Sequence, residues 1–123
     1  MTDNELTHEI IGAAIEVHRM PGPGLLESAC EECPSHELSI RGLRFERQRL
    51  VAIVYKDVKL ECGFRTDLPI EGCIVAELKS VEALAPIHEA IMLTYLRLSH
   101  SQLGLLINFN VQTLKDGVQR FIV

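Results

Sequence analysis

Apolar residues near the start of the chain recur every three or four positions, which is the spacing of an amphipathic helix. Thr2 and Glu5 have the spacing of a capping box, so this helix is expected to begin there. Its apolar face is predicted to be Leu6, Ile10, Ala13, Ala14 and Val17. The Pro-Gly-Pro-Gly run at residues 21–24 should end the helix, because proline and glycine do not continue one.

A second helical pattern runs from Leu25 to about Arg41, and Gly42 is a natural residue to follow its last turn. Pro34 lies inside this pattern. An interior proline removes a backbone hydrogen bond and costs a helix about 3 kcal/mol. We therefore expect a kink or a break near residues 30–34.

The middle of the chain has the pattern of strands. Residues 50–55 are rich in β-branched side chains, and Lys56-Asp57 is expected to form a turn. Two further strand-like runs follow at 58–68 and 73–78. Because Glu71 and Gly72 lie in the connection between them, these two runs should form a hairpin.

The last third of the chain predicts a helix between strands. Pro86 suits the first turn of this helix, and its apolar face is predicted to be Ile87, Ala90, Ile91, Tyr95 and Leu98. The continuous apolar run at 103–109 is typical of a buried strand, and 118–123 predicts a final strand. The predicted order along the chain is two helices, three strands, a helix and two strands. This order indicates a mixed α/β fold with helices packed on a sheet.

Composition places these elements in one domain. The sequence has 123 residues, 47% of them hydrophobic, which is enough for one core without disulfides or metals. We find no repeat and no linker, so residues 1–123 are expected to form a single domain. The net charge of −5 argues against a broadly basic nucleic-acid coat protein, but an acidic metal-binding cluster would be compatible with it.

The N-terminus and the cysteines bear on location. Residues 1–5 are acidic and polar, unlike a signal peptide, and no run of 18 apolar residues suggests a membrane span. We therefore expect a cytoplasmic protein whose four cysteines (Cys30, Cys33, Cys62 and Cys73) are free thiols or ligands. A four-thiolate zinc or iron–sulfur site is the less favoured alternative, because Cys73 should lie in a turn far from Cys30.

Candidate chemistry centres on Asp67, Glu77 and Lys79. Glu77 and Lys79 are two residues apart in a strand, so they point to the same face. Asp67 points there too if it lies opposite Glu77. That register requires an odd-length loop, most simply residues 71–73 with Gly72 at its centre. The sequence thus permits two carboxylates and an ammonium to converge.

Two carboxylates are hard oxygen ligands that suit Mg²⁺ or Mn²⁺. Such a metal polarises a phosphoryl oxygen and activates water, while a nearby lysine stabilises developing negative charge. The alternative is that the three residues form an ordinary solvent-facing row. Glu27, near the start of the second helix, either complements the helix dipole or adds a third acidic ligand.

Four blocks of sequence resemble those of one protein family. They are Gly-Leu-Leu-Glu-Ser-Ala-Cys at 24–30, Cys-Gly-Phe-Arg-Thr-Asp-Leu at 62–68, Ile-Val-Ala-Glu-Leu-Lys at 74–79 and Leu-Leu-Ile-Asn-Phe-Asn at 105–110. From about Ile10 to Gly117 the chain resembles the bacterial GxxExxY proteins of the PD-(D/E)XK nuclease superfamily. The resemblance implies an α/β, restriction-endonuclease-like αβββαβ core in which helices flank a mixed sheet.

The same resemblance implies a function and a set of site residues. Asp67 and Glu77 would bind Mg²⁺ or Mn²⁺ together with Glu27, and Lys79 would be the catalytic lysine. The expected activity is phosphodiester hydrolysis of nucleic acid, with DNA as the expected substrate. His88 and Tyr95 on the later helix become candidates for substrate binding, although His88 could equally cap or pack near Pro86.

Three positions depart from the family pattern. Cys30 stands where the signature has tyrosine, Ile91 stands where the later helix usually has glutamine, and Pro34 interrupts a helix. Isoleucine cannot form a hydrogen bond. The alternative is therefore a weak or inactive relative that binds nucleic acid or a partner protein. Because a small domain has little surface to grip a duplex, association as a homodimer would suit the nuclease.

Overall fold

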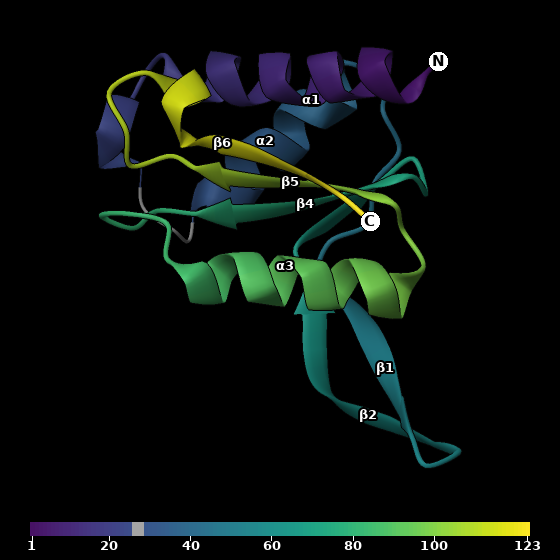
Figure 1. Cartoon of the computed structure of the whole chain (residues 1–123). Helices are drawn as coiled ribbons and strands as arrows, with labels where there is room; N and C mark the ends of the chain where they lie inside the picture. The colour runs from purple at the N-terminus through teal and green to yellow at the C-terminus, as the bar shows by residue number, and fades with distance from the viewer. Residues whose placement is uncertain (26–28) are drawn as a thin grey trace.

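The computed structural model describes residues 1–25 and 29–123, without the side chains of residues 61–64. A four-stranded sheet lies between two helices on one side and a third helix on the other, and a hairpin extends beyond the third helix (Figure 1). This arrangement confirms the α/β class with a restriction-endonuclease-like mixed sheet. The helices are α1 (Asp3–His18), α2 (Ala29–Ile40) and α3 (Pro86–Ser99), with short 3-10 helices η1 (Gly22–Gly24) and η2 (Leu114–Gly117).

The sheet has the order β3-β4-β5-β6. Its central strands, β4 and β5, are parallel because α3 connects them, and both outer pairs are antiparallel. The remaining two strands, β1 and β2, pair only with each other within the described sheets. The strands are β1 (Arg49–Tyr55), β2 (Val58–Thr66), β3 (Leu68–Ile70), β4 (Ile74–Lys79), β5 (Leu103–Asn108) and β6 (Val118–Ile122).

The run at 58–68 was expected to be one strand, and that prediction is wrong at Asp67. The chain divides there into β2 and β3, which belong to different sheets. Both backbone groups of Asp67 have partners outside a strand ladder. Its N–H donates to the Glu77 carboxylate, and its carbonyl accepts from the Gln48 N–H. These two contacts turn the chain from the hairpin into the sheet.

The first helix follows its sequence signals. Thr2 caps α1 by accepting a hydrogen bond from the Glu5 N–H at 3.1 Å, as the spacing predicted. Leu6, Ile10, Ala13 and Ala14 are buried, so the predicted apolar face is the packed one. This face covers the sheet together with α2 (Figure 1).

The second helix differs from its prediction. Its described part, Ala29–Ile40, continues through Pro34 without a break, so the break expected near residues 30–34 is absent. Pro34 is buried and faces Ile10 and Leu38 between the helices, and this burial offsets the lost backbone hydrogen bond. The predicted end is confirmed: Gly42 has φ +75°, and the Leu43 N–H donates to the Leu38 carbonyl at 3.0 Å.

The third helix packs through a different stripe from the predicted one. Met92 and Leu96 are fully buried against Val75 and Leu106, whereas Ile87 is 61% exposed. The prediction was wrong because apolar residues cover most of this helix, so periodicity alone could not decide which stripe faces the sheet. The apolar patch that the sheet offers to α3 is small, since Glu77 occupies part of that face.

Candidate active site

The register of β3 and β4 brings Asp67 and Glu77 together. Leu68 pairs with Ala76 and Ile70 with Ile74, so the next position pairs Asp67 with Glu77. The loop is the predicted three residues, 71–73, and Gly72 has φ +65°. The odd-length turn required by the sequence argument is therefore confirmed.

The two carboxylates are held by reciprocal hydrogen bonds. The Asp67 N–H donates to Glu77 Oε1 at 3.0 Å, and the Leu78 N–H donates to Asp67 Oδ2 at 2.9 Å. Each side chain is thus bound to the backbone of the opposite strand. This arrangement fixes both carboxylates at the junction between the hairpin and the sheet.

Glu77 is an unusual residue for a strand interior because its side chain is ionisable and only 5% exposed. The pKa of Glu77 is raised to about 9, mainly by burial and secondly by the negative charge of Asp67. The Asp67 N–H and the Lys79 ammonium act in the opposite direction. Two negative charges are therefore unfavourable together in this poorly solvated place, and an added cation would favour the ionised form of Glu77.

These residues fit a hard divalent cation. Mg²⁺ is commonly held by one or two carboxylates, with water and substrate phosphate completing its coordination. Asp67 and Glu77 supply two carboxylates on one face. No three His, Cys, Asp or Glu side chains cluster as a metal site in the part of the chain that the structure describes. Glu27, the predicted third ligand, lies outside the described residues.

Lys79 lies at the end of β4, two residues after Glu77 and on the same face of the strand. It is half-buried, and its ammonium is close enough to Glu77 to lower the pKa of that carboxyl. The Lys79 carbonyl accepts from the Phe109 N–H at 2.8 Å. The structure therefore brings Lys79 beside the carboxylate pair, as the sequence predicted.

Tyr95 approaches the same carboxylates from α3. Burial raises the pKa of its phenol, and the charges of Glu77 and Asp67 raise that pKa further. A hydrogen bond from the Arg65 backbone partly offsets the increase. Ile91 precedes Tyr95 by one helical turn and is 38% exposed.

His88 has a defined structural contact at the start of α3. Its Nδ1 accepts a hydrogen bond from the Ala85 N–H at 2.9 Å, which caps the helix. Of the two roles considered from the sequence, capping is the one that has a contact in the structure.

The cysteines are dispersed. Cys30 is buried, with its Sγ 3.9 Å from the Lys79 carbonyl, behind the strand that carries the candidate lysine. Cys33 and Cys73 are exposed, and Cys73 lies in the loop between β3 and β4. The side chain of Cys62 lies outside the description, so a four-thiolate site has no support from the residues described.

Gln48 is a site residue that the sequence pattern did not single out. Its Nε2 donates to Asp67 Oδ1 at 3.2 Å and to Glu31 Oε2 at 3.1 Å. Gln48 has φ +53°, and this turn directs its side chain toward Asp67. A glutamine between two arginines carries no local signal of this role, because the contact depends on a partner 19 residues away.

Asn108 organises the segment that follows Lys79. It is buried at the end of β5, in register with Lys79. Its Oδ1 accepts from the Val81 N–H at 3.1 Å, and its Nδ2 donates to the Val81 carbonyl at 2.9 Å. Asn108 therefore fixes the direction in which the chain leaves the candidate site.

Comparison with known proteins gives one family. A profile of the PD-(D/E)XK nuclease superfamily matches residues 4–121, and no curated protein and no solved structure gives a match. In the described part of the chain, no helix has the length and apolar composition to span a bilayer. The family match covers β3, β4 and α3, the elements that carry the carboxylate pair, Lys79 and Tyr95. The chain therefore belongs to the PD-(D/E)XK nuclease superfamily, whose members are typically metal-dependent nucleases.

Proposed function

We propose that this chain is a Mg²⁺- or Mn²⁺-dependent phosphodiesterase that cleaves DNA, and that it belongs to the GxxExxY group of its superfamily. The observation that carries the proposal is the buried pair of carboxylates, Asp67 and Glu77, with the Lys79 ammonium beside it. Residues 1–123 would act as one domain in the cytoplasm.

Each residue has a proposed part. Asp67 and Glu77 hold the cation, and Glu27 adds a carboxylate from the segment before α2. The bound cation would supply polarisation of the phosphoryl group and activation of water. Lys79 stabilises the negative charge that develops on the phosphoryl oxygens. Tyr95 donates its phenolic hydrogen to the substrate, and Gln48 orients Asp67 through the contact at Oδ1.

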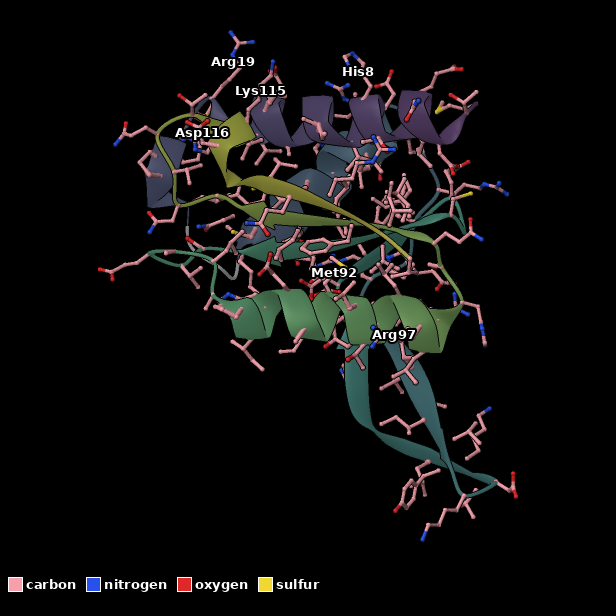
Figure 2. The ribbon with its side chains drawn as sticks, viewed as in Figure 1. His8, Arg19, Met92, Arg97, Lys115 and Asp116 are labelled. Atoms are coloured by element: carbon pink, nitrogen blue, oxygen red, sulfur yellow. The ribbon has the colours of Figure 1, made fainter. Side chains whose placement is uncertain are left out.

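Cleavage assays with purified protein test this proposal. Labelled single-stranded and duplex DNA are incubated with Mg²⁺, with Mn²⁺ and with a chelator. Asp67→Asn and Glu77→Gln should each lower the rate by at least about 100-fold, because a metal contributes several kcal/mol to charge stabilisation. Asp116→Asn removes an exposed carboxylate of η2, far from α3, and should leave the rate unchanged (Figure 2). Cleavage that survives in both site variants would refute the proposal.

The second candidate function is nucleic-acid or partner-protein binding without cleavage. Ile91 favours it, because a partly exposed apolar side chain lies one turn from Tyr95 where a hydrogen-bonding glutamine is expected. Ile91→Gln separates the two functions. An increase in DNA cleavage would mean that the wild-type chain is a weakened nuclease. Absence of cleavage in both proteins, with intact DNA binding, would favour the binding function.

The proposed nuclease would grip a duplex best as a homodimer with two sites. Light scattering on the purified full chain, with and without duplex DNA, measures this directly. A mass of one chain under both conditions would contradict the dimer without affecting the proposed chemistry.

A further inference from the structure

A groove of about 300 Å³ lies between the base of the β1–β2 hairpin and the C-terminal turn of α3. One wall comes from β1 and β2, and the other comes from the end of the helix. The residues lining it are Arg49, Leu50, Val51, Ala52, Lys59, Leu98, Ser99 and His100. Figure 1 shows the hairpin leaving the body of the molecule beneath α3, at this position.

The charge of the groove differs from that of the chain as a whole. The chain carries a net charge of −5, but the ionisable residues that line the groove in the described part of the chain are basic: Arg49, Lys59 and His100. Arg65 pairs with Leu50 across the hairpin and is exposed on the same face. Arg97, on the last turn of α3, projects near the hairpin (Figure 2). Such a local excess of positive charge is suited to a phosphate backbone.

Among the side chains that the structure describes, local interactions neutralise this charge only weakly. Arg49 is 3.5 Å from Glu46, in an ion pair whose two side chains are both exposed, and such pairs are weak. No ion pair is found for Lys59, Arg65, Arg97 or His100 among the described residues. The basic residues of the last turn also offset the partial negative charge of the helix C-terminus.

Both walls of the groove lead to the candidate active site. Arg49 directly follows Gln48, whose side chain contacts Asp67, and Arg49 pairs with Thr66, the residue before Asp67. On the other wall, the Ser99 hydroxyl donates to the Tyr95 carbonyl at 2.6 Å. A strand bound in the groove would therefore be directed toward Asp67, Glu77 and Tyr95.

We propose that this groove binds single-stranded DNA and guides it into the active site. This inference rests on the proposed nuclease function and specifies its substrate. Between the basic residues, the lining is apolar: Leu50, Val51, Ala52 and Leu98. A single strand offers unpaired bases to such a surface and phosphates to the cations, whereas a duplex hides its bases. The combination therefore favours one strand over two.

Binding measured without cleavage tests the groove. Fluorescence anisotropy of a labelled oligo-dT is recorded in a chelator at several salt concentrations. Lys59→Gln should weaken binding about tenfold, because it removes a charge-assisted contact. It should also reduce the slope of log K against log salt by about 0.7, the value expected for one phosphate contact on a single strand. Lys59→Gln/Arg49→Gln should reduce the slope by about 1.4.

Lys115→Gln is the matched control. Lys115 is exposed on η2, beside α1 and on the opposite side of the molecule from the hairpin (Figure 2). Equal effects of Lys59→Gln and Lys115→Gln, or a duplex that binds more tightly than the single strand, would overturn the groove. Loss of binding in Lys59→Gln without cleavage under any metal would support the groove and refute the nuclease. Cleavage that requires Asp67 but does not change in Lys59→Gln would support the nuclease and refute the groove.

Discussion

The β3–β6 sheet and the β1–β2 hairpin are made from similar strand-forming residues, yet they have opposite environments. All six residues of β5 and all three of β3 are buried. In the hairpin, by contrast, Val54, Tyr55 and Val58 are more than half exposed. The difference arises because helices cover both faces of the sheet, whereas the hairpin is a two-stranded ribbon that contacts α3 near its base.

The two regions contribute differently to the proposed function. The covered sheet holds Glu77 in a poorly solvated position and fixes its distance from Asp67. The hairpin remains open to solvent and presents cations next to that position. The chain passes from the hairpin to the sheet at residues 66–68. At this junction the rigid, buried region proposed for catalysis adjoins the exposed region proposed for binding.

Hydrogen exchange should reveal the largest difference between the two regions. Amides of β4 and β5 should exchange only through global unfolding, because both strands are buried and central. Amides near the hairpin turn at Lys56 and Asp57 should exchange at least about 1,000-fold faster, through local opening. Mass spectrometry of the native protein provides the measurement. Equal protection of the two regions would show that the hairpin is covered in solution.

A matched pair of leucines should separate the regions by stability. Leu105 in β5 is 0% exposed, and Leu60 in β2 is 40% exposed. Leu105→Ala should lower the free energy of unfolding by about 2–5 kcal/mol, since it leaves a cavity between sheet and helices. Leu60→Ala should lower it by less than about 1 kcal/mol. Urea unfolding followed by circular dichroism measures both, and similar losses would contradict the comparison.

The pH dependence of stability should report Glu77. The pKa of Glu77 rises from an ordinary 4.5 to about 9 on folding. The folded state therefore holds this proton more tightly, and the resulting stability is full below about pH 4 and lost as pH rises toward 9. In a chelator, Tm should fall across this range, and Glu77→Gln should flatten the decrease. Asp116→Asn should keep the wild-type slope. If the Tm of Glu77→Gln fell with pH as steeply as that of the wild type, this result would argue against a buried, proton-binding Glu77.

The smallest effects are expected from exposed ion pairs. Arg47, in the segment that leads to the hairpin, contacts Glu31 and Glu32 of α2. Arg41 contacts Glu9 and Glu37 between α1 and α2. Arg47→Gln should lower Tm slightly at low salt and not at about 1 M salt, where charges are screened within about 3 Å. Arg41→Gln should retain more of its effect in salt, because its side chain is less exposed. Calorimetry at two salt concentrations makes the comparison.

The sequence by itself determined the elements whose signals are local. Thr2, Gly42 and Pro86 mark helix ends through contacts or dihedral angles within a few residues, and all three predictions were confirmed. The odd loop with Gly72 at its centre could be stated in advance as the condition for convergence, because strand parity and glycine's access to positive φ both act locally. These two facts permitted the pairing of Asp67 with Glu77, and the register of β3 and β4 established it.

Only the tertiary structure decided what lies against these elements. It selected Met92 and Leu96 as the buried stripe of α3, although Ile87 and Ile91 are equally apolar. It also divided the strand at Asp67 and brought Gln48 to that carboxylate, through partners 10 to 19 residues away. Burial and side-chain hydrogen bonds depend on which surfaces meet. Residue type limits which surfaces can pack together, but the packing of whole helices and strands decides which of them do.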